Sequence, residues 1–81
     1  MLKVMRLYIY SLDKILYEGD ADVLTVPSET GELSILPHHA PIVTTLKSGK
    51  VMIRSKDGHQ NIPIQSGFAQ INQDQTILLV K

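Results

Sequence analysis

The chain has 81 residues, which leaves room for a single domain over residues 1–81 and excludes a multidomain enzyme with separate cofactor and substrate halves. Eight Lys and Arg residues balance eight Asp and Glu residues, so the chain has no general electrostatic attraction for nucleic acid or anionic lipid. It contains no cysteine, which excludes disulfide frameworks, thiol nucleophiles and thiolate metal sites.

Apolar and polar residues alternate over short distances, whereas the spacing typical of amphipathic helices is not sustained anywhere. The first segment places Met5, Leu7 and Ile9 on one face, which we expect to be buried. The rhythm of short strands separated by turns predicts an all-β sandwich or small barrel. In chain order, strands are expected over residues 4–10, 15–17, 22–26, 33–36, 42–46, 51–54, 61–64, 67–72 and 76–80.

Proline and polar residues mark the connections between these strands. We expect Pro27 to end the strand before it and residues 28–32 to form a polar loop. Residues 37–41 form a corner framed by two prolines, and Pro63 marks an edge strand or a strand end.

No arrangement of residues indicates catalysis or metal binding. The adjacent His38 and His39 point in opposite directions in an extended segment, and no third histidine at a ligand spacing joins them, since His59 stands alone. No serine lies in a G-x-S-x-G elbow, and Asp20 and Asp22 are carboxylates beside a tight turn, where such pairs are usually solvated. We therefore expect no catalytic residue, no metal site and no cofactor, and a protein that is not an enzyme.

An interaction module remains, with two other β-rich scaffolds as competitors. A lipoyl- or biotinyl-carrier domain presents a modifiable lysine at a hairpin tip in mid-chain, and Lys14 resembles one but lies near the N-terminus. A nucleic-acid-binding OB-fold needs aromatic residues interleaved with basic ones, whereas aromatic residues make up 5% of this chain. The carrier domain bearing a lysine-linked cofactor is kept as the alternative. For residues 29–32 and 37–41, composition alone favours a binding surface and a plain loop equally.

A specific series of motifs runs through the chain: Glu18-Gly19-Asp20-Ala21, Val26-Pro27, Gly31-Glu32-Leu33-Ser34-Ile35-Leu36-Pro37-His38-His39-Ala40-Pro41, Leu46-Lys47-Ser48-Gly49 and Ser66-Gly67-Phe68. In order and spacing this series resembles the epsilon subunit of F-type ATP synthases, over essentially the whole chain. The resemblance implies the N-terminal β-sandwich of that family, with roughly ten short, mostly antiparallel strands, which agrees with the alternation of residues.

The resemblance also implies a mechanical role. In that family the domain lies at the foot of the central stalk, packs against the gamma subunit and rests on polar loops of the membrane c-ring, so that rotation of the ring turns gamma within the catalytic head. We therefore expect a non-catalytic rotor subunit whose direct partners are gamma and the c-ring, with the catalytic-head subunits as indirect partners and no nucleic acid partner. A compact sandwich suits this role because its interlocked inner faces resist deformation.

Two contact surfaces follow from the resemblance. Carboxylates in the c-ring-facing loop can pair with basic or amide groups on the ring, and Glu32 is the leading candidate. An apolar patch is expected at the gamma contact, and exposed Ile or Val at the corner would be its sign. The loop toward the c-ring comprises Glu29, Thr30, Gly31 and Glu32, and the residues toward gamma are Ser11, His39, Ala40, Pro41, Ile42, Val43 and Thr44.

The chain departs from the family at three positions. The glycine before Ile-Leu-Pro is Ser34 here, the glycine before His-Ala-Pro is His38, and the proline before Gly49 is Ser48. If position 38 takes a positive φ, His38 is strained or the corner is reshaped, although histidine tolerates this conformation better than most residues.

Most bacterial and chloroplast relatives continue into a two-helix C-terminal hairpin that inhibits ATP hydrolysis and, in some, binds ATP. The resemblance therefore implies that these 81 residues carry neither helix-based inhibition nor the ATP site. It also implies a location at the cytoplasmic face of the bacterial inner membrane, reached through the ATP synthase complex. The sequence shows no signal peptide and no run of the roughly 20 apolar residues that cross a bilayer, so we expect no direct membrane insertion.

Overall fold

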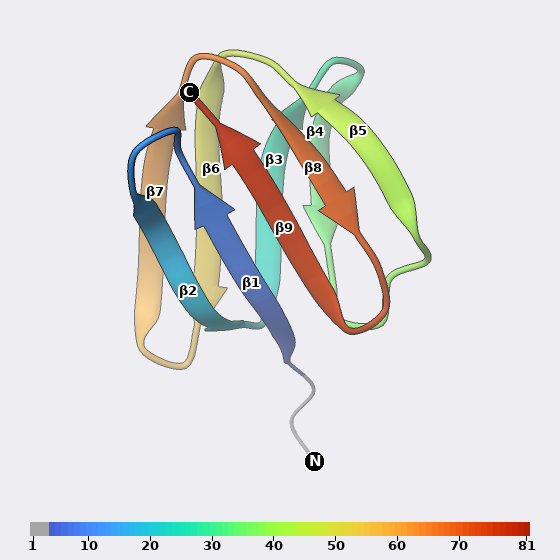
Figure 1. Ribbon diagram of the computed structural model, residues 1–81. Coiled ribbons are helices and arrows are strands. Elements are labelled where there is room, and N and C mark those ends of the chain that lie inside the picture. The colour runs from blue at the N-terminus through green and yellow to red at the C-terminus, as the bar shows by residue number, and fades with distance from the viewer. Residues whose placement is uncertain (1–3) are drawn as a thin grey trace.

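The computed structural model describes residues 4–81, and these residues form nine strands and no helix (Figure 1). This confirms the predicted all-β sandwich, and the nine strands match the number of ranges expected from the residue pattern, whereas the family resemblance implied roughly ten. The strands are β1 (Met5–Tyr10), β2 (Ile15–Ala21), β3 (Val23–Ser28), β4 (Gly31–Ile35), β5 (Ile42–Leu46), β6 (Gly49–Ser55), β7 (Gly58–Ile64), β8 (Gly67–Ile71) and β9 (Gln75–Val80).

The strands form one curled sheet that folds into two layers. The first layer has the order β2-β1-β9-β8-β5, and the second has the order β4-β3-β6-β7. All pairs are antiparallel except β1 with β9, which run side by side in parallel (Figure 1). The layers join where Ser28, at the end of β3, pairs with Leu46, at the end of β5.

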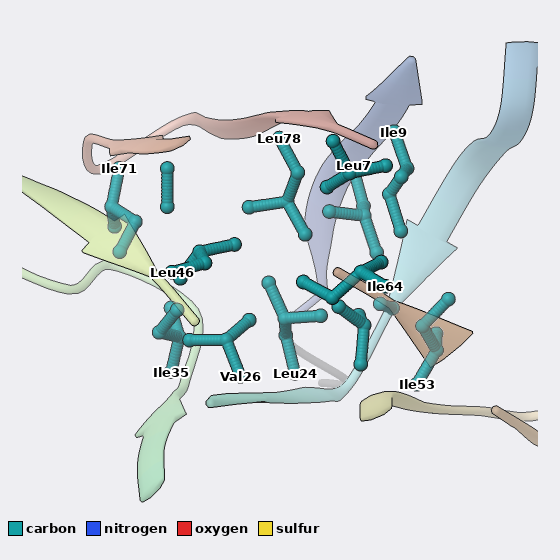
Figure 2. Close-up of a cluster of buried hydrophobic side chains, with 14 of the residues drawn as sticks. Leu7, Ile9, Leu24, Val26, Ile35, Leu46, Ile53, Ile64, Ile71 and Leu78 are labelled. Carbon is teal, nitrogen blue, oxygen red and sulfur yellow. The ribbon is translucent and has the colours of Figure 1, made fainter. Parts of the chain in front are cut away.

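The core lies between the two layers and is almost entirely aliphatic. As predicted, Met5, Leu7 and Ile9 on β1 are buried. In Figure 2 the labelled side chains of the two layers point toward one another, and Leu46 lies between them where the layers join. Each fully buried side chain of this size contributes about 1.5–3 kcal/mol relative to an exposed one. The facing side chains are Leu7, Ile9, Ile71 and Leu78 from the first layer and Leu24, Val26, Ile35, Ile53 and Ile64 from the second.

The prediction that Pro27 ends a strand is wrong, because Pro27 is buried inside β3. On that side of β3, β6 pairs only with residues 23–25, and β5 pairs only with Ser28. Pro27 lies in the gap between these two pairings, where no backbone donor is needed, and its carbonyl oxygen accepts a hydrogen bond from the Lys47 N–H at 2.8 Å. Pro63 does lie in an edge strand, as predicted, since β7 pairs only with β6.

Candidate interaction surfaces

The tip of the β3–β4 hairpin carries the loop predicted to face the c-ring. The predicted polar loop over residues 28–32 is shorter in the structure, because Ser28 ends β3 and Gly31 begins β4, which leaves Glu29 and Thr30 as the turn. The Ser28 hydroxyl donates a hydrogen bond to the Gly31 carbonyl oxygen and lies 3.3 Å from the Thr30 hydroxyl oxygen. Gly31 has a φ of 123°, a conformation that glycine adopts without strain. Glu29 and Glu32 are both exposed, so the tip presents two carboxylates on a short, internally bonded turn.

This turn is bonded directly to the end of β5. The Glu29 N–H donates to the Thr45 carbonyl oxygen at 3.3 Å, and the Lys47 N–H donates to Pro27 in the opposite direction. These bonds flank the pairing of Ser28 with Leu46, both of which are buried. The predicted c-ring loop and the strand predicted to contact gamma are therefore parts of one hydrogen-bonded unit.

The β4–β5 corner, residues 36–41, connects the two layers. Pro37 and His38 form its turn, and His38 has a φ of 65°, so position 38 does require the left-handed conformation. The His39 Nδ1 lies 2.7 Å from the Ala40 carbonyl oxygen; because that oxygen can only accept, Nδ1 carries the proton in this contact. Ala40 and Pro41 are exposed.

The start of β5 exposes aliphatic side chains beside this corner. Ile42 is 37% exposed and Val43 is 58% exposed. The exposed Ile and Val side chains that were expected at the corner are therefore present. Thr44 is half-buried and pairs with the buried Ala69 of β8, which places it on the inner face of the layer, while Val43 lies on the outer face.

Ser11 lies apart from the other residues predicted to contact gamma. Because β1, β9 and β5 run in the same direction, the end of β1 is level with the end of β5, whereas His39 precedes the start of β5. The Ser11 hydroxyl donates to Asp13 Oδ1 at 3.1 Å, and its N–H donates to the Lys14 carbonyl oxygen. The structure thus brings Ser11 to the end of the layer where the β3–β4 turn also lies, and places His39 at the opposite end.

Sequence reasoning missed an exposed apolar surface beside Ser11, which we call the Phe68 surface and define as Leu12, Phe68 and Leu79. Leu12 is 92% exposed, Leu79 54% and Phe68 46%. They border an open hollow of about 400 Å³ that Ser11 and Thr45 also line. The available signal was the alternation of residues in β8 and β9: neighbours such as Ala69 and Leu78 point inward, so Phe68 and Leu79 must point outward.

The outer face of β1 and β2 carries a small charged and aromatic cluster. The Arg6 guanidinium lies 3.5 Å from Asp20 and 5.5 Å from the centre of the Tyr8 ring, which stacks with Tyr10. The hydrogen bond from Arg6 to Tyr8 is the main cause that raises the pKa of Arg6 above its ordinary value, and Asp20 adds to it. All of these groups are exposed or half-exposed, so the cluster contributes little to stability.

Within residues 4–81, no three His, Asp or Glu side chains lie together in a way that could hold a metal ion. Lys14, the residue considered for a carrier domain, is exposed in the β1–β2 turn. No helix long and apolar enough to span a bilayer is found in the described part of the chain. The surface features of the domain are thus an acidic turn, a proline-framed corner, exposed aliphatic side chains on β5 and an apolar hollow, which define a small all-β interaction domain.

Comparison with known proteins gives this class a family. Residues 4–81 match the family described as ATP synthase, Delta/Epsilon chain, beta-sandwich domain, and the chain belongs to this family. It is 37% identical over 75 residues to the ATP synthase epsilon chain of Dichelobacter nodosus and 38% identical over 76 residues to that of Leptospira borgpetersenii. It is 33% identical over 76 residues to the chloroplastic epsilon chain of Stigeoclonium helveticum. These alignments cover 91–94% of the chain but only 52–59% of the relatives, so the chain spans a little over half of their length.

Solved structures show the same fold. A chain in the mitochondrial ATP synthase of Euglena gracilis, a structure that contains OSCP, F1 and the c-ring, superposes with a TM-score of 0.88 at 20% identity. That superposition covers 95% of this chain and 50% of the other. A chain from the central stalk and c-ring of the Tetrahymena thermophila mitochondrial ATP synthase superposes with a TM-score of 0.78 at 17% identity, covering 94% and 62%.

Proposed function

We propose that this chain acts as the rotor-coupling sandwich of an epsilon subunit, a non-catalytic part of the central stalk of an F-type ATP synthase. The observation that carries this proposal is the family match over residues 4–81, which includes every strand of the sandwich. In this role the domain holds the gamma subunit on one side and the c-ring on another, with the catalytic-head subunits as indirect partners. It makes and breaks no covalent bonds.

The β3–β4 turn is the proposed contact with the c-ring. Glu29, Thr30, Gly31 and Glu32 lie at the exposed tip of a hairpin whose hydrogen bonds fix its shape. Carboxylates held on such a tip can pair with basic or amide groups of ring loops and so fix the register between the two surfaces.

The proposed contact with gamma comprises the corner, the start of β5 and Ser11. Exposed apolar and small side chains at Ala40, Pro41, Ile42 and Val43 suit a permanent contact that excludes water. Because Ser11 and His39 lie at opposite ends of the first layer, gamma would extend along the direction of β5 to reach both.

Transmission of torque requires that the two contacts move together. The hydrogen bonds of Glu29 with Thr45 and of Lys47 with Pro27 connect the acidic turn to β5 directly. A force on the turn is therefore passed to the gamma-facing strand without bending a loop.

We place the protein at the cytoplasmic face of the bacterial inner membrane, held there through the synthase. Two of the cited relatives are bacterial, and a third is chloroplastic. Fractionation of the source cells tests this placement: the chain should sediment with membranes and be released with the F1 sector when the synthase is dissociated.

The test of the function is capture of the rotor by the chain from detergent-solubilised membranes stripped of their resident epsilon subunit, with mass spectrometry of the captured proteins. Recovery of gamma, the c-ring and the head subunits is expected. Failure to capture gamma from a preparation that holds the rest of the synthase would overturn the proposal. The family match gives no support to the carrier-domain alternative, and an unmodified intact mass, without an adduct on Lys14, would exclude it.

A further inference from the structure

One strand of the sandwich has an edge without the protection that the other edges have. The strands with an open edge are β2 and β7 at the ends of the sheet order, β4, which pairs only with β3, and β5. On its open side β5 meets β3 only at the pairing of Leu46 with Ser28. From Ile42 to Thr44, no strand among residues 4–81 lies along that side.

The other three strands carry features that discourage pairing with a foreign strand. In β2 there are Glu18 and Asp20, together with a register irregularity opposite Ile9 and Tyr10. In β4 there is Glu32, and in β7 there is Pro63. In contrast, β5 has the sequence Ile-Val-Thr-Thr-Leu, with no charge, proline or glycine, and its register with β8 has no irregularity. Such an edge is a template for strand addition.

The backbone groups on this edge can be assigned from the hydrogen bonds present. Successive residues of an antiparallel strand direct their N–H and C=O groups to alternate sides. The Thr45 carbonyl oxygen accepts a hydrogen bond from the Glu29 N–H, so it points away from β8. Because Val43 is two residues before Thr45, the backbone N–H and C=O groups of Val43 also point away from β8. The open edge therefore offers the N–H and C=O of Val43 and the N–H of Thr45, beside the exposed side chains of Ile42 and Val43.

We propose that the gamma subunit binds this domain by strand addition: an extended segment of gamma pairs with the open edge of β5 at Val43 and Thr45. This inference rests on the proposed function, since it specifies how the gamma contact is made. The edge follows the β4–β5 corner directly in the chain, so one segment of gamma can contact the corner and pair with β5. Because β5 has no charged side chain, the segment needs an uncharged, β-branched or aromatic residue opposite Val43.

Hydrogen exchange of the backbone amides tests the pairing directly. In the free chain, the amides of Val43 and Thr45 should exchange rapidly, while those of Thr44 and Leu46, which point toward β8, should be protected. In the complex with the gamma subunit of the same synthase, Val43 and Thr45 should become protected as well. The readout is the spectrum of the ¹⁵N-labelled chain after exchange in the complex and release under quench conditions.

A pair of variants separates the backbone bond from the side chain. Val43→Pro removes the N–H at a position where β8 does not need it, and should weaken gamma binding by about tenfold or more. Val43→Thr keeps the N–H and the strand preference of the residue, and should bind within about threefold of the original chain. Thermal unfolding of both variants shows whether the sandwich is intact; the exchange measurement stands whether or not Val43→Pro folds.

The outcomes are distinguishable. Protection of Val43 and Thr45 in the complex supports strand addition. A stable complex in which both amides still exchange rapidly refutes strand addition and leaves the proposed rotor function standing. No complex with gamma refutes the proposed function and this inference with it.

Discussion

Gly67 lies directly against the backbone of Leu79: a Cβ atom placed on Gly67 would be 2.8 Å from the Leu79 carbonyl oxygen. The two residues belong to the paired strands β8 and β9, and Leu46 and Val80 also lie within 3.4 Å of that position. Neither the main chain of β9 nor the buried Val80 can move without disturbing the core. A side chain at position 67 therefore requires the backbone of β9 to shift.

We expect Gly67→Ala to lower the free energy of unfolding by about 1–3 kcal/mol, the usual cost of overpacking a close contact. The matched control is Gly19→Ala, because a Cβ at Gly19 would be 3.6 Å from the Tyr17 hydroxyl oxygen, an ordinary contact. Urea unfolding of both variants makes the comparison. Equal stabilities of the two variants would contradict the close approach.

At position 38, glycine should improve the domain. His38 has a φ of 65°, a conformation that destabilises the folded state by about 1–2 kcal/mol for a residue with a side chain. Glycine avoids this strain, but its more flexible unfolded chain offsets part of the gain in stability. We expect His38→Gly to raise the free energy of unfolding by up to about 1 kcal/mol, and the neighbouring His39→Gly to lower it by about 0.5–1 kcal/mol. Thermal unfolding checks both signs, and a loss of stability in His38→Gly would contradict the strain.

Truncating a buried leucine should lower the free energy of unfolding far more than truncating an exposed leucine. Leu24 is fully buried and Leu12 is 92% exposed, so the same substitution tests two environments. Leu24→Ala should cost about 2–5 kcal/mol, whereas Leu12→Ala should change stability by less than about 0.5 kcal/mol. Chemical denaturation measures both, and a large cost at Leu12 would show that it packs against the sandwich.

Glu32→Lys should weaken attachment of the domain to the c-ring while leaving the fold intact. The carboxylate is exposed, so reversing its charge should remove the proposed pairing with ring loops without disturbing the core. The control is Asp74→Lys, which makes the same charge change in the β8–β9 turn, at the opposite end of the layer from the β3–β4 turn. The measurement is retention of each variant on isolated c-ring with gamma present; equal retention of the two variants would argue against the assignment.

Much of the fold could be predicted because alternation in a single strand depends on local residues. Met5, Leu7 and Ile9 were assigned correctly to the buried face from the pattern alone, and of the two positions predicted for Pro63, an edge strand or a strand end, the structure shows an edge strand. The prediction for Pro27 was wrong because it ignored the neighbouring strands. β5 and β6 pair with different parts of β3, and the gap between these pairings is where β3 tolerates a proline.

The resemblance proposes the residues of the candidate site, but the sequence does not predict how they are arranged in space. The family resemblance proposes Ser11 and His39 as gamma contacts, but the direction of β1 relative to β5, which separates the two residues, depends on the parallel pairing of β1 with β9. The Phe68 surface was missed because residues 68 and 79 meet only once β8 and β9 pair. Such relationships depend on register between strands, which a single sequence does not specify strongly.

Because β1 pairs with β9, the first described strand of the domain cannot complete its pairing until β9 has been synthesised. On a ribosome, Leu7 and Ile9 find their neighbours Thr76 and Leu78 only after almost seventy further residues have been made. Contacts so distant in sequence slow folding, and the central strand of the first layer, β9, is the last of the nine described strands in chain order. We therefore expect the domain to complete its core, and to become able to bind its partners, only after β9 has emerged from the ribosome.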